Sequence, residues 1–285
     1  MWKLPVILRE MFWSRLSGSL EYTVSGAVIS DVGRKRTQNQ DNFYFEGLIN
    51  GDRSHSLRYK LQGAALPRAY ALMDGMGGEK LGAQASLEAA GFFSHINKKI
   101  LKALSRANQR DRERMFNSLV YSMNQRVCQM AQRHQVKQSG TTFVGVFLAG
   151  NRAYLISVGD SRIFLIREGA ALLQNKLDTI YLSVVEKGRK KEIRGGLSQF
   201  LGMDTLEYDL APHIRELDLK AGDRFLICSD GLTDYVSREE IGERVWGTSM
   251  EDSLDILLHL ALERGGGDNV TILRLDIKDA HSALK

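Results

Sequence analysis

The order of helix-like and strand-like segments constrains the fold of this chain more than any other feature of its sequence. Apolar residues recur every three or four positions over residues 80–104 and 111–136, which indicates two long amphipathic helices. Strand-like segments occupy both sides of this pair, at residues 22–30, 42–46, 69–73, 141–148, 152–158, 161–167, 213–218, 223–229 and 270–276. Because strands and helices come in blocks and do not strictly alternate, the pattern favours antiparallel sheets covered by helices.

Two shorter helices are expected toward the end of the chain, because two apolar segments are each preceded by a capping-box pattern. The patterns pair Ser237 with Glu240 and Thr248 with Glu251. Residues 170–205, by contrast, show no clear period. The basic run at 187–194 is interpreted as a solvated loop, with attraction of acidic phosphopeptides as the alternative.

Composition indicates one large globular domain. Of the 285 residues, 43% are hydrophobic and 26% charged, which is enough to bury a substantial core, and there is no low-complexity linker. We therefore predict a single domain at residues 21–279, an N-terminal extension at 1–20 and a C-terminal tail at 280–285.

Net charge and cysteine content limit the binding partners and the cellular location that we expect. The net charge of +5 is spread along the chain, which favours a solvated surface over nucleic-acid binding. Cys128 and Cys228 are expected to be free thiols, which predicts a reducing, cytoplasmic location. No run of 18 apolar residues occurs, so no transmembrane segment is expected. The amphipathic stretch 1–16 leaves contact with a membrane surface open, the alternative being an extension packed on its own domain.

Three aspartates stand where apolar strands run out into glycine or asparagine. A carboxylate at the edge of a core is costly unless a positive group meets it. If the strands converge, the like charges must either be protonated or be neutralised by cations, for which hard divalent ions with oxygen ligands are suited. This makes a metal-assisted hydrolase the leading hypothesis. The three dipeptides are Asp74-Gly75, Asp230-Gly231 and Asp268-Asn269.

Six short motifs that include these aspartates appear in a fixed order along the chain. They are Arg36-Thr-Gln-Asn39-Gln40-Asp41, Asp74-Gly75-Met76-Gly77-Gly78, Ser139-Gly140-Thr141-Thr142, Gly159-Asp160-Ser161-Arg162, Ser229-Asp230-Gly231-Leu232 and Gly267-Asp268-Asn269. Together they resemble the metal-dependent protein Ser/Thr phosphatases, the protein phosphatase 2C-like family in its bacterial style, over residues 25–276. The resemblance implies an α+β fold, in which a sandwich of two antiparallel sheets is flanked on both outer faces by pairs of helices.

The resemblance also implies a centre of two Mn²⁺ or Mg²⁺ ions, with a third, weaker ion, and a role for each motif residue. Arg36, Asp74 and Asp230 are the expected catalytic residues, and Arg36 is also expected to bind the substrate phosphate through its planar guanidinium. Asn39 and Asn269 are expected to support the ligands. The expected metal ligands are Asp74 and the Gly75 carbonyl, Asp230, Asp268, Asp41 directly or through water, and Asp160 at the third site.

The implied reaction is hydrolysis of phosphoserine and phosphothreonine in proteins by a metal-bridging hydroxide. Two hard cations can lower the pKa of a shared water and stabilise both oxygens of an in-line displacement, so no Ser, Cys or His nucleophile is required. None of the six histidines falls in a matching motif. The expected partners are phosphorylated proteins and a Ser/Thr kinase system whose action the enzyme reverses, and the chain is expected to be a monomer.

Other functions fit the sequence less well. A non-catalytic binding module has no physical reason to keep mutually repelling carboxylates at closely matched positions. A nucleotide-binding switch or kinase would need a Gly-x-x-x-x-Gly-Lys-Ser/Thr loop, which the sequence lacks. An aspartyl-phosphate hydrolase would need two aspartates one residue apart after a strand, and that pattern is also missing.

Overall fold

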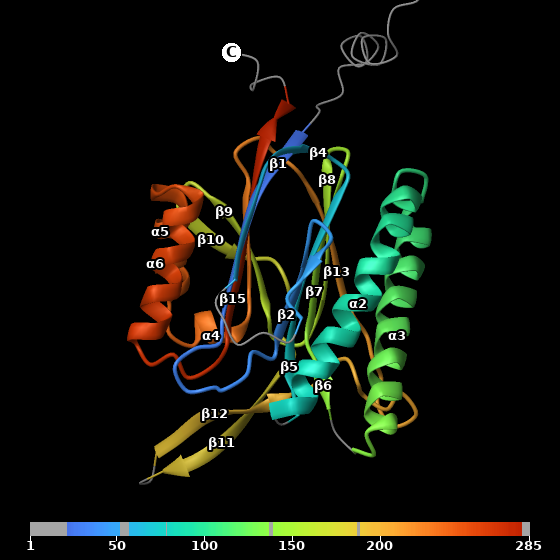
Figure 1. Cartoon of the computed structure of the whole chain (residues 1–285), viewed down its shortest axis with the longest axis vertical. Helices are drawn as coiled ribbons and strands as arrows, with labels where there is room; N and C mark the ends of the chain where they lie inside the picture. Colours follow the sequence, from blue (N-terminus) through green and yellow to red (C-terminus); the bar gives the residue numbers. More distant parts are fainter. Residues whose placement is uncertain (1–21, 52–56, 78, 137–138, 187–188, 281–285) are drawn as a thin grey trace, which may run out of the picture.

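The chain forms two large antiparallel sheets accompanied by helices (Figure 1). The computed structural model describes residues 22–51, 57–77, 79–136, 139–186 and 189–280. The predicted extension at 1–20 lies outside the described residues, as does the predicted tail apart from Ala280. The α+β class and the two antiparallel sheets predicted from the sequence are confirmed.

The first sheet has six strands in the order β10-β9-β14-β15-β1-β4. Its first and last members in the chain, β1 and β15, pair along ten residues, from Tyr22 opposite Asp279 to Asp31 opposite Val270. The strands of this sheet are β1 (Tyr22–Asp31), β4 (Leu57–Ala65), β9 (Arg162–Arg167), β10 (Ala170–Leu173), β14 (Arg224–Cys228) and β15 (Val270–Asp279).

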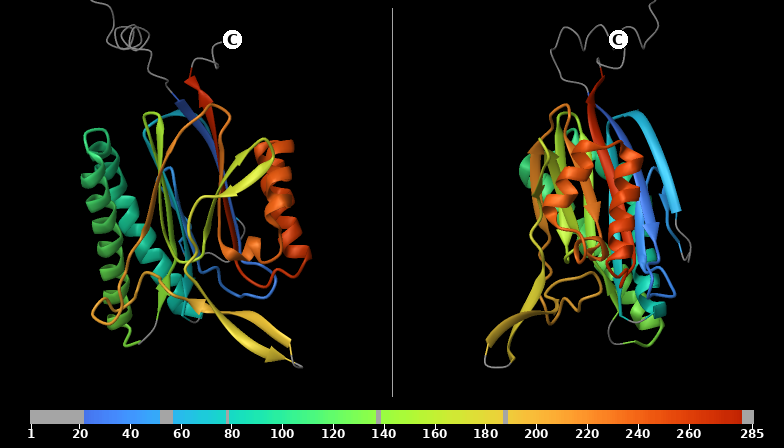
Figure 2. Two further views of the ribbon diagram at one scale, coloured as in Figure 1. Left: turned by 180° about the vertical axis from the view of Figure 1, so that it is seen from behind. Right: turned by 90° about the vertical axis from the view of Figure 1, so that its left-hand side faces the viewer.

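The second sheet has the order β13-β8-β7-β5-β2-β3, with β6 paired to β5 off this path. A separate two-stranded hairpin, β11 with β12, projects from the body (Figures 1 and 2). The strands of the second sheet are β2 (Asp41–Phe45), β3 (Leu48–Ile49), β5 (Arg68–Met76), β6 (Gly140–Thr141), β7 (Phe143–Ala149), β8 (Arg152–Val158) and β13 (His213–Asp218), and the hairpin consists of β11 (Thr179–Glu186) and β12 (Arg189–Leu197).

Five helices accompany the sheets in the described part of the chain. The long pair lies beside the seven-stranded sheet, and α5 and α6 lie beside the six-stranded one (Figure 1). None of the described helices is long and apolar enough to cross a bilayer. The helices are α2 (Glu79–Leu104), α3 (Gln109–Arg133), α4 (Asp230–Thr233), α5 (Arg238–Gly247) and α6 (Met250–Glu263).

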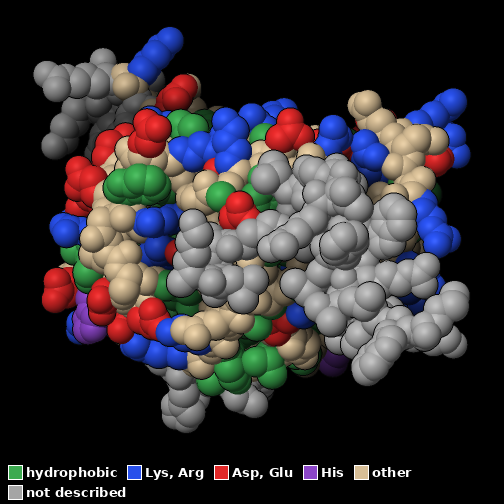
Figure 3. Space-filling model, turned by 90° about the horizontal axis from the view of Figure 1, so that it is seen from above, with side chains coloured by type: hydrophobic (Ala, Val, Ile, Leu, Met, Phe, Trp, Pro, Cys, Tyr) green, Lys and Arg blue, Asp and Glu red, His purple; other side chains and the backbone are tan. Residues whose placement is uncertain are grey.

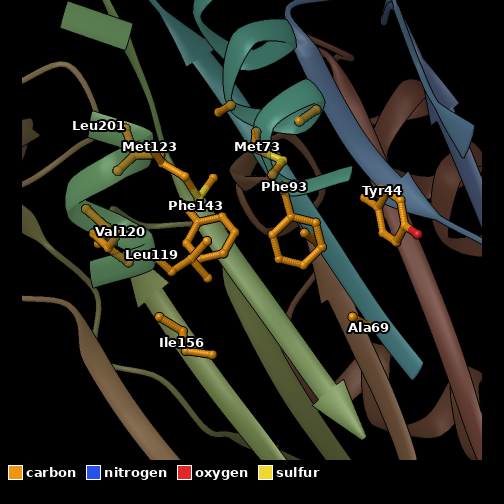
Figure 4. Close-up of a cluster of buried hydrophobic side chains, with 14 of the residues drawn as sticks. Tyr44, Ala69, Met73, Phe93, Leu119, Val120, Met123, Phe143, Ile156 and Leu201 are labelled. Atoms are coloured by element: carbon orange, nitrogen blue, oxygen red, sulfur yellow. The ribbon is translucent and has the colours of Figure 1, made fainter. Parts of the chain in front are cut away.

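Three clusters of buried apolar side chains join these elements. One lies between the two sheets, one joins the six-stranded sheet to α5 and α6, and one joins α2 and α3 to the seven-stranded sheet. In the last cluster, Phe93 of α2 packs against Tyr44 of β2 and Phe143 of β7, with ring centroids 5.3 and 5.7 Å apart (Figure 4). The stripe of aromatic and Met residues along the long helices is therefore core, as their period predicts.

The helix N-termini confirm one predicted cap and correct the other. Ser237 and Glu240 form the predicted capping box at the start of α5. The N-cap of α6 is Ser249 and not Thr248, because the Ser249 side chain accepts a hydrogen bond from the backbone N–H of Asp252. Thr248 instead donates its hydroxyl to the carbonyl of Arg244 in α5. The prediction at Thr248 was wrong by one residue, since Thr and Ser are both strong caps.

Basic and acidic side chains are interspersed on the face seen from above in Figure 3. This mixture of signs is typical of a solvated surface.

Candidate metal centre

Strand ends from both sheets bring the predicted aspartates together. Asp41 begins β2 and lies directly opposite Asp74, which stands near the end of the neighbouring strand β5. Asp230 follows the end of β14, and Asp268 lies just before β15, the strand paired with β14. A hydrogen bond links the two sheets at this point. Ser229, directly after β14, donates its hydroxyl to Oδ2 of Asp41 in β2 at 2.7 Å.

Mutual repulsion and burial make two of these carboxylates, Asp41 and Asp74, costly to ionise. The pKa of Asp74 is raised well above its ordinary value by burial and then by the charges of Asp41, Asp230 and Asp268. The Asp41 side chain is 1% exposed, and burial raises its pKa to about 7 against the hydrogen bonds from Thr271 and Ser229, which lower it. An excess of buried negative charge of this kind is the condition that divalent cations relieve.

The donor set fits a hard cation. The candidate donors are the carboxylate oxygens of the four aspartates and, as the sequence predicts, the Gly75 carbonyl, and such hard oxygen donors suit Mg²⁺ and Mn²⁺. Among the described residues, no three side chains of the His, Cys, Asp and Glu types already surround one ion position. Two arginines instead pair with members of the group: Arg36 with Asp268, and Arg194 with Asp230.

Gly75 is required by close packing. A Cβ at this position would stand 2.2 Å from the Gly82 carbonyl oxygen and 2.7 Å from that of Gln40. The backbone N–H of Gly75 donates to the Gln40 carbonyl at 3.2 Å. The approach of α2 and of the segment before Asp41 therefore leaves no room for a side chain at this position.

Two asparagines, Asn39 and Asn269, hold the backbone around Asp41 through hydrogen bonds. Asn39 accepts the backbone N–H of Asp41 at 3.0 Å and donates to Ser30 Oγ at 2.9 Å. Asn269 accepts the backbone N–H of Gln40 at 2.7 Å and donates to the carbonyls of Val32 and Gln38. Asn269 thereby fastens the segment that carries Arg36 to the start of β15.

The two threonines of the Ser-Gly-Thr-Thr motif form hydrogen bonds with the backbone of Asp74. The Thr142 hydroxyl accepts the backbone N–H of Asp74 at 2.9 Å, and the Thr141 hydroxyl donates to the Asp74 carbonyl at 2.9 Å. Thr142 also shares a hydrogen bond with Ser161, the residue after Asp160, at 2.8 Å. The motif therefore links Asp74 to the turn that carries Asp160.

Arg36 lies at the edge of the carboxylate group. Its Nη2 is 2.8 Å from Asp268 Oδ2, and both side chains remain partly exposed. This hydrogen bond to Asp268 is the main cause that raises the pKa of Arg36 above its ordinary value. The guanidinium therefore stands beside the metal-ligand candidates with exposed surface left for a phosphate.

Arg194 and Asp234 are site residues that the sequence interpretation missed. Arg194 Nη2 donates to Asp160 Oδ2 and lies 2.6 Å from Asp230 Oδ2, while Nη1 is 3.7 Å from Asp234. The interpretation of residues 187–194 as a solvated loop was wrong for Arg194, which belongs to strand β12. The four-residue spacing of Asp230 and Asp234 on a helical turn was the one available signal for Asp234.

The match to a protein family agrees with this geometry. The sequence profile described as Protein phosphatase 2C matches residues 42–263. The chain belongs to the protein phosphatase 2C family. The matched region contains Asp74, Asp160 and Asp230, whereas Arg36, Asp41 and Asp268 lie outside it and are placed at the site by the structure.

Bacterial phosphatases of the family are similar along most of the chain. Serine/threonine protein phosphatase PstP of Mycobacterium tuberculosis is 32% identical over 89% of this chain, which spans 45% of the length of PstP. The putative protein phosphatase 2C-type of Streptococcus pyogenes is 29% identical over 85% of this chain and 93% of its own length. The crystal structure of the PstP catalytic domain in complex with two manganese ions superposes with a TM-score of 0.68, at 29% identity over 90% of this chain and 100% of that domain.

Proposed function

We propose that the chain is a metal-dependent protein phosphatase that hydrolyses phosphoserine and phosphothreonine in proteins, and so reverses a Ser/Thr kinase. The observation that carries the proposal is the convergence of Asp41, Asp74, Asp230 and Asp268, in which burial and the neighbouring carboxylates raise the pKa of Asp41 and Asp74. Family membership and the manganese-bound relative support it.

Two Mn²⁺ or Mg²⁺ ions would be held by the four aspartates and the Gly75 carbonyl, and would activate water and neutralise phosphate oxygens. Asp74, Asp230 and Asp268 would each supply carboxylate oxygens to this pair of ions. A third, weaker ion at Asp160 would compete with Arg194 for the same oxygen. The Mn²⁺ pair bound to the catalytic domain of PstP supports the number of strong sites.

The chain's own groups would orient the substrate. Arg36 presents a guanidinium whose fork matches two phosphate oxygens, and its pairing with Asp268 holds it at the edge of the site. Ser229 fixes the Asp41 carboxylate by donating its hydroxyl, and Thr142 fixes the Asp74 backbone. Phosphoryl transfer to water depends on such positioning and on charge stabilisation, which this site provides without a covalent nucleophile.

The proposal extends to the arrangement of the whole molecule. Residues 21–279 would form the catalytic domain, with the helix-sheet-sheet-helix layering of the family, which the three core clusters support. We also propose that the domain acts as a monomer in the cytoplasm, and that residues 1–16 are the part of the chain through which it would touch a membrane surface or its own domain. The two cysteines are free thiols, which agrees with a reducing setting.

Hydrolysis of p-nitrophenyl phosphate and of a phosphothreonine peptide, measured with and without Mn²⁺, tests the function. Wild-type protein should turn over both substrates only with metal, and Asp230→Asn should lose at least about a thousandfold in kcat while keeping its circular dichroism spectrum. Asp218→Asn removes a carboxylate that is exposed on β13 and is the matched control. No turnover by folded wild-type protein at saturating Mn²⁺ would favour a non-catalytic binding module.

A further inference from the structure

The projecting hairpin sends one side chain back into the carboxylate group. Strands β11 and β12 pair only with each other in the described part of the chain, and they extend past the end of the sandwich (Figure 2). From β12, Arg194 reaches Asp160 and Asp230 with the same nitrogen, Nη2, and approaches Asp234 with Nη1. The arginine is 38% exposed, whereas Asp160 and Asp230 are only 5% and 15% exposed.

The backbone around Arg194 is shaped for this contact. Tyr181 pairs with Arg194 and Ile180 with Gly196, so the ladder skips Gly195 and the strand bends directly after the arginine. A Cβ on Gly195 would stand 2.6 Å from Leu182 Cγ, and Gly196 has a φ of +135°. Both positions favour glycine, and together they fix the direction in which Arg194 leaves the hairpin.

The base of the hairpin is also fastened to the turn that carries Asp160. The Asp178 carboxylate accepts the backbone N–H of Gly159 at 3.0 Å, and the Asp178 N–H donates to the Gly159 carbonyl at 3.0 Å. Ser198, just after β12, donates its backbone N–H to the Asp178 carbonyl at 2.8 Å, and His213 bonds the same carboxylate. Arg194 and Asp160 are therefore anchored to a common point.

A guanidinium between Asp160 and Asp230 satisfies the same need as a cation. It supplies one fixed positive charge and two N–H donors to carboxylates that are nearly buried. A divalent ion that used the same oxygens would meet a positive charge at contact distance, where repulsion is strong. The two occupants therefore exclude each other at Asp160. At Asp230 the arginine pairs with Oδ2, and the second oxygen of that carboxylate is left for one of the two strong ions, while Asp74, Asp41 and Asp268 make no ion pair with Arg194 among the described contacts.

We propose that Arg194 is a tethered cation that occupies the position of the third, weaker ion, so that the chain binds two divalent ions and not three. The inference rests on the proposed function for those two ions. Asp160 is then a partner of an arginine in the wild-type protein, and it becomes available to a metal ion only when Arg194 is removed or withdrawn.

Counting bound Mn²⁺ on the full chain by equilibrium dialysis with metal analysis tests this inference without relying on activity. Wild type should bind two ions. Arg194→Ala should bind three ions. The Kd of its third ion should be at least about tenfold lower than the Kd of any third ion on wild type. Lys190→Ala, which removes a positive charge from the same strand, is the matched control and should leave the count at two.

Asp160→Asn makes the assignment specific. In the wild-type background it should leave two ions bound, because the arginine and not a metal uses that carboxylate. In the Arg194→Ala background it should abolish the third ion. Three ions on wild type, or an unchanged count in Arg194→Ala, would overturn the role of Arg194 alone, whereas fewer than two ions on folded wild type would contradict the proposed function and this inference with it.

Discussion

Asp41 shows how a single buried carboxylate can be stabilised and still be unfavourable when ionised. It receives the Ser229 hydroxyl, and its backbone is held by Asn39, yet burial dominates and brings its pKa to about 7. Hydrogen bonds therefore position the group more than they stabilise its charge. The remaining electrostatic cost is available to be offset by a bound cation.

The pH dependence of stability in the metal-free protein follows from this residue. Between about pH 4 and 7 the folded state binds more protons at Asp41 than the unfolded state, because the folded pKa is raised from 3.8 to about 7. The raised pKa of Asp41 therefore adds to the free energy of unfolding at low pH, and this contribution is lost as the pH rises toward 7. Urea unfolding in EDTA at pH 5 and pH 8 should show a smaller loss for Asp41→Asn than for wild type; an identical loss in both proteins would contradict the assignment.

Arg36 is expected to contribute to substrate binding more than to turnover. Its guanidinium is partly exposed beside Asp268, so Arg36→Ala should raise KM for a phosphopeptide by roughly tenfold or more, with a smaller effect on kcat. Arg34→Ala, two residues away, is the control and should leave KM near that of wild type. Steady-state kinetics at saturating Mn²⁺ would measure both, and equal KM values for the two variants would remove Arg36 from the phosphate site.

Gly75→Ala should destabilise the fold by about 1–3 kcal/mol, because the added methyl group would meet the Gly82 and Gln40 backbone oxygens. Gly91→Ala is the matched control within α2, where a Cβ meets nothing within 4 Å and a helical alanine is favoured by up to about 1 kcal/mol. Denaturant titration of both variants should give changes of opposite sign. Equal stabilities would show that the close approach at Gly75 is not required.

Among the elements, those with a buried face were predictable and the exposed ones were not. The long helices and the longer buried strands show their period because one side of each packs on a core cluster, whereas β4 and β10, at the edges of the six-stranded sheet, were not predicted. The β11–β12 hairpin leaves Tyr181, Leu182 and Ile193 exposed, and its basic residues and glycines interrupt any alternation. No hydrophobic pattern could identify it, so Arg194 could not be placed.

The assignment of Ser249 as the N-cap of α6 can be tested by substitution. Ser249→Ala should destabilise the protein by about 1 kcal/mol, because it removes the acceptor of the Asp252 N–H. Thr248→Ala should cost less, roughly half a kcal/mol or below, since its hydroxyl donates to the exposed carbonyls of Arg244 and Ser249 and caps no helix N–H. Thermal unfolding of the two variants would distinguish them, and a larger effect at Thr248 would return the cap to the residue predicted from the sequence.

At the scale of the whole molecule, the candidate site was accessible from sequence because its aspartates end apolar strands. Asp74, Asp230 and Asp268 stand out against the buried runs before or after them, and the structure brings their strands together. Contacts made by side chains distant in the chain carried no such signal. The distance between Arg194 and Asp160 in sequence, and the common occurrence of surface arginines, concealed their pairing.

Metal binding should be visible as global stabilisation. At Mn²⁺ concentrations about 100 times the Kd, one site adds about 2.7 kcal/mol to the free energy of unfolding, which corresponds to a rise in Tm of roughly 5–10 °C for a domain of this size. Asp74→Asn should lose most of this rise, because Asp74 faces the other three carboxylates. Scanning calorimetry with Mn²⁺ and with EDTA would measure it, and an undiminished shift in Asp74→Asn would place the ions elsewhere.

Because β1 and β15 pair along their full length, the first and last strands of the domain bring Tyr22 and Asp279 to the same place. Tyr22 and Asp279 lie side by side at one extremity of the pair, while Asp31 and Val270 lie at the other, next to Asp268. Ten residues of strand separate the two extremities by about 30 Å. A linker fused directly before Tyr22 or directly after Asp279 would therefore begin about 30 Å from the carboxylates, and protein immobilised through it should keep the carboxylate end of the sandwich open to solvent.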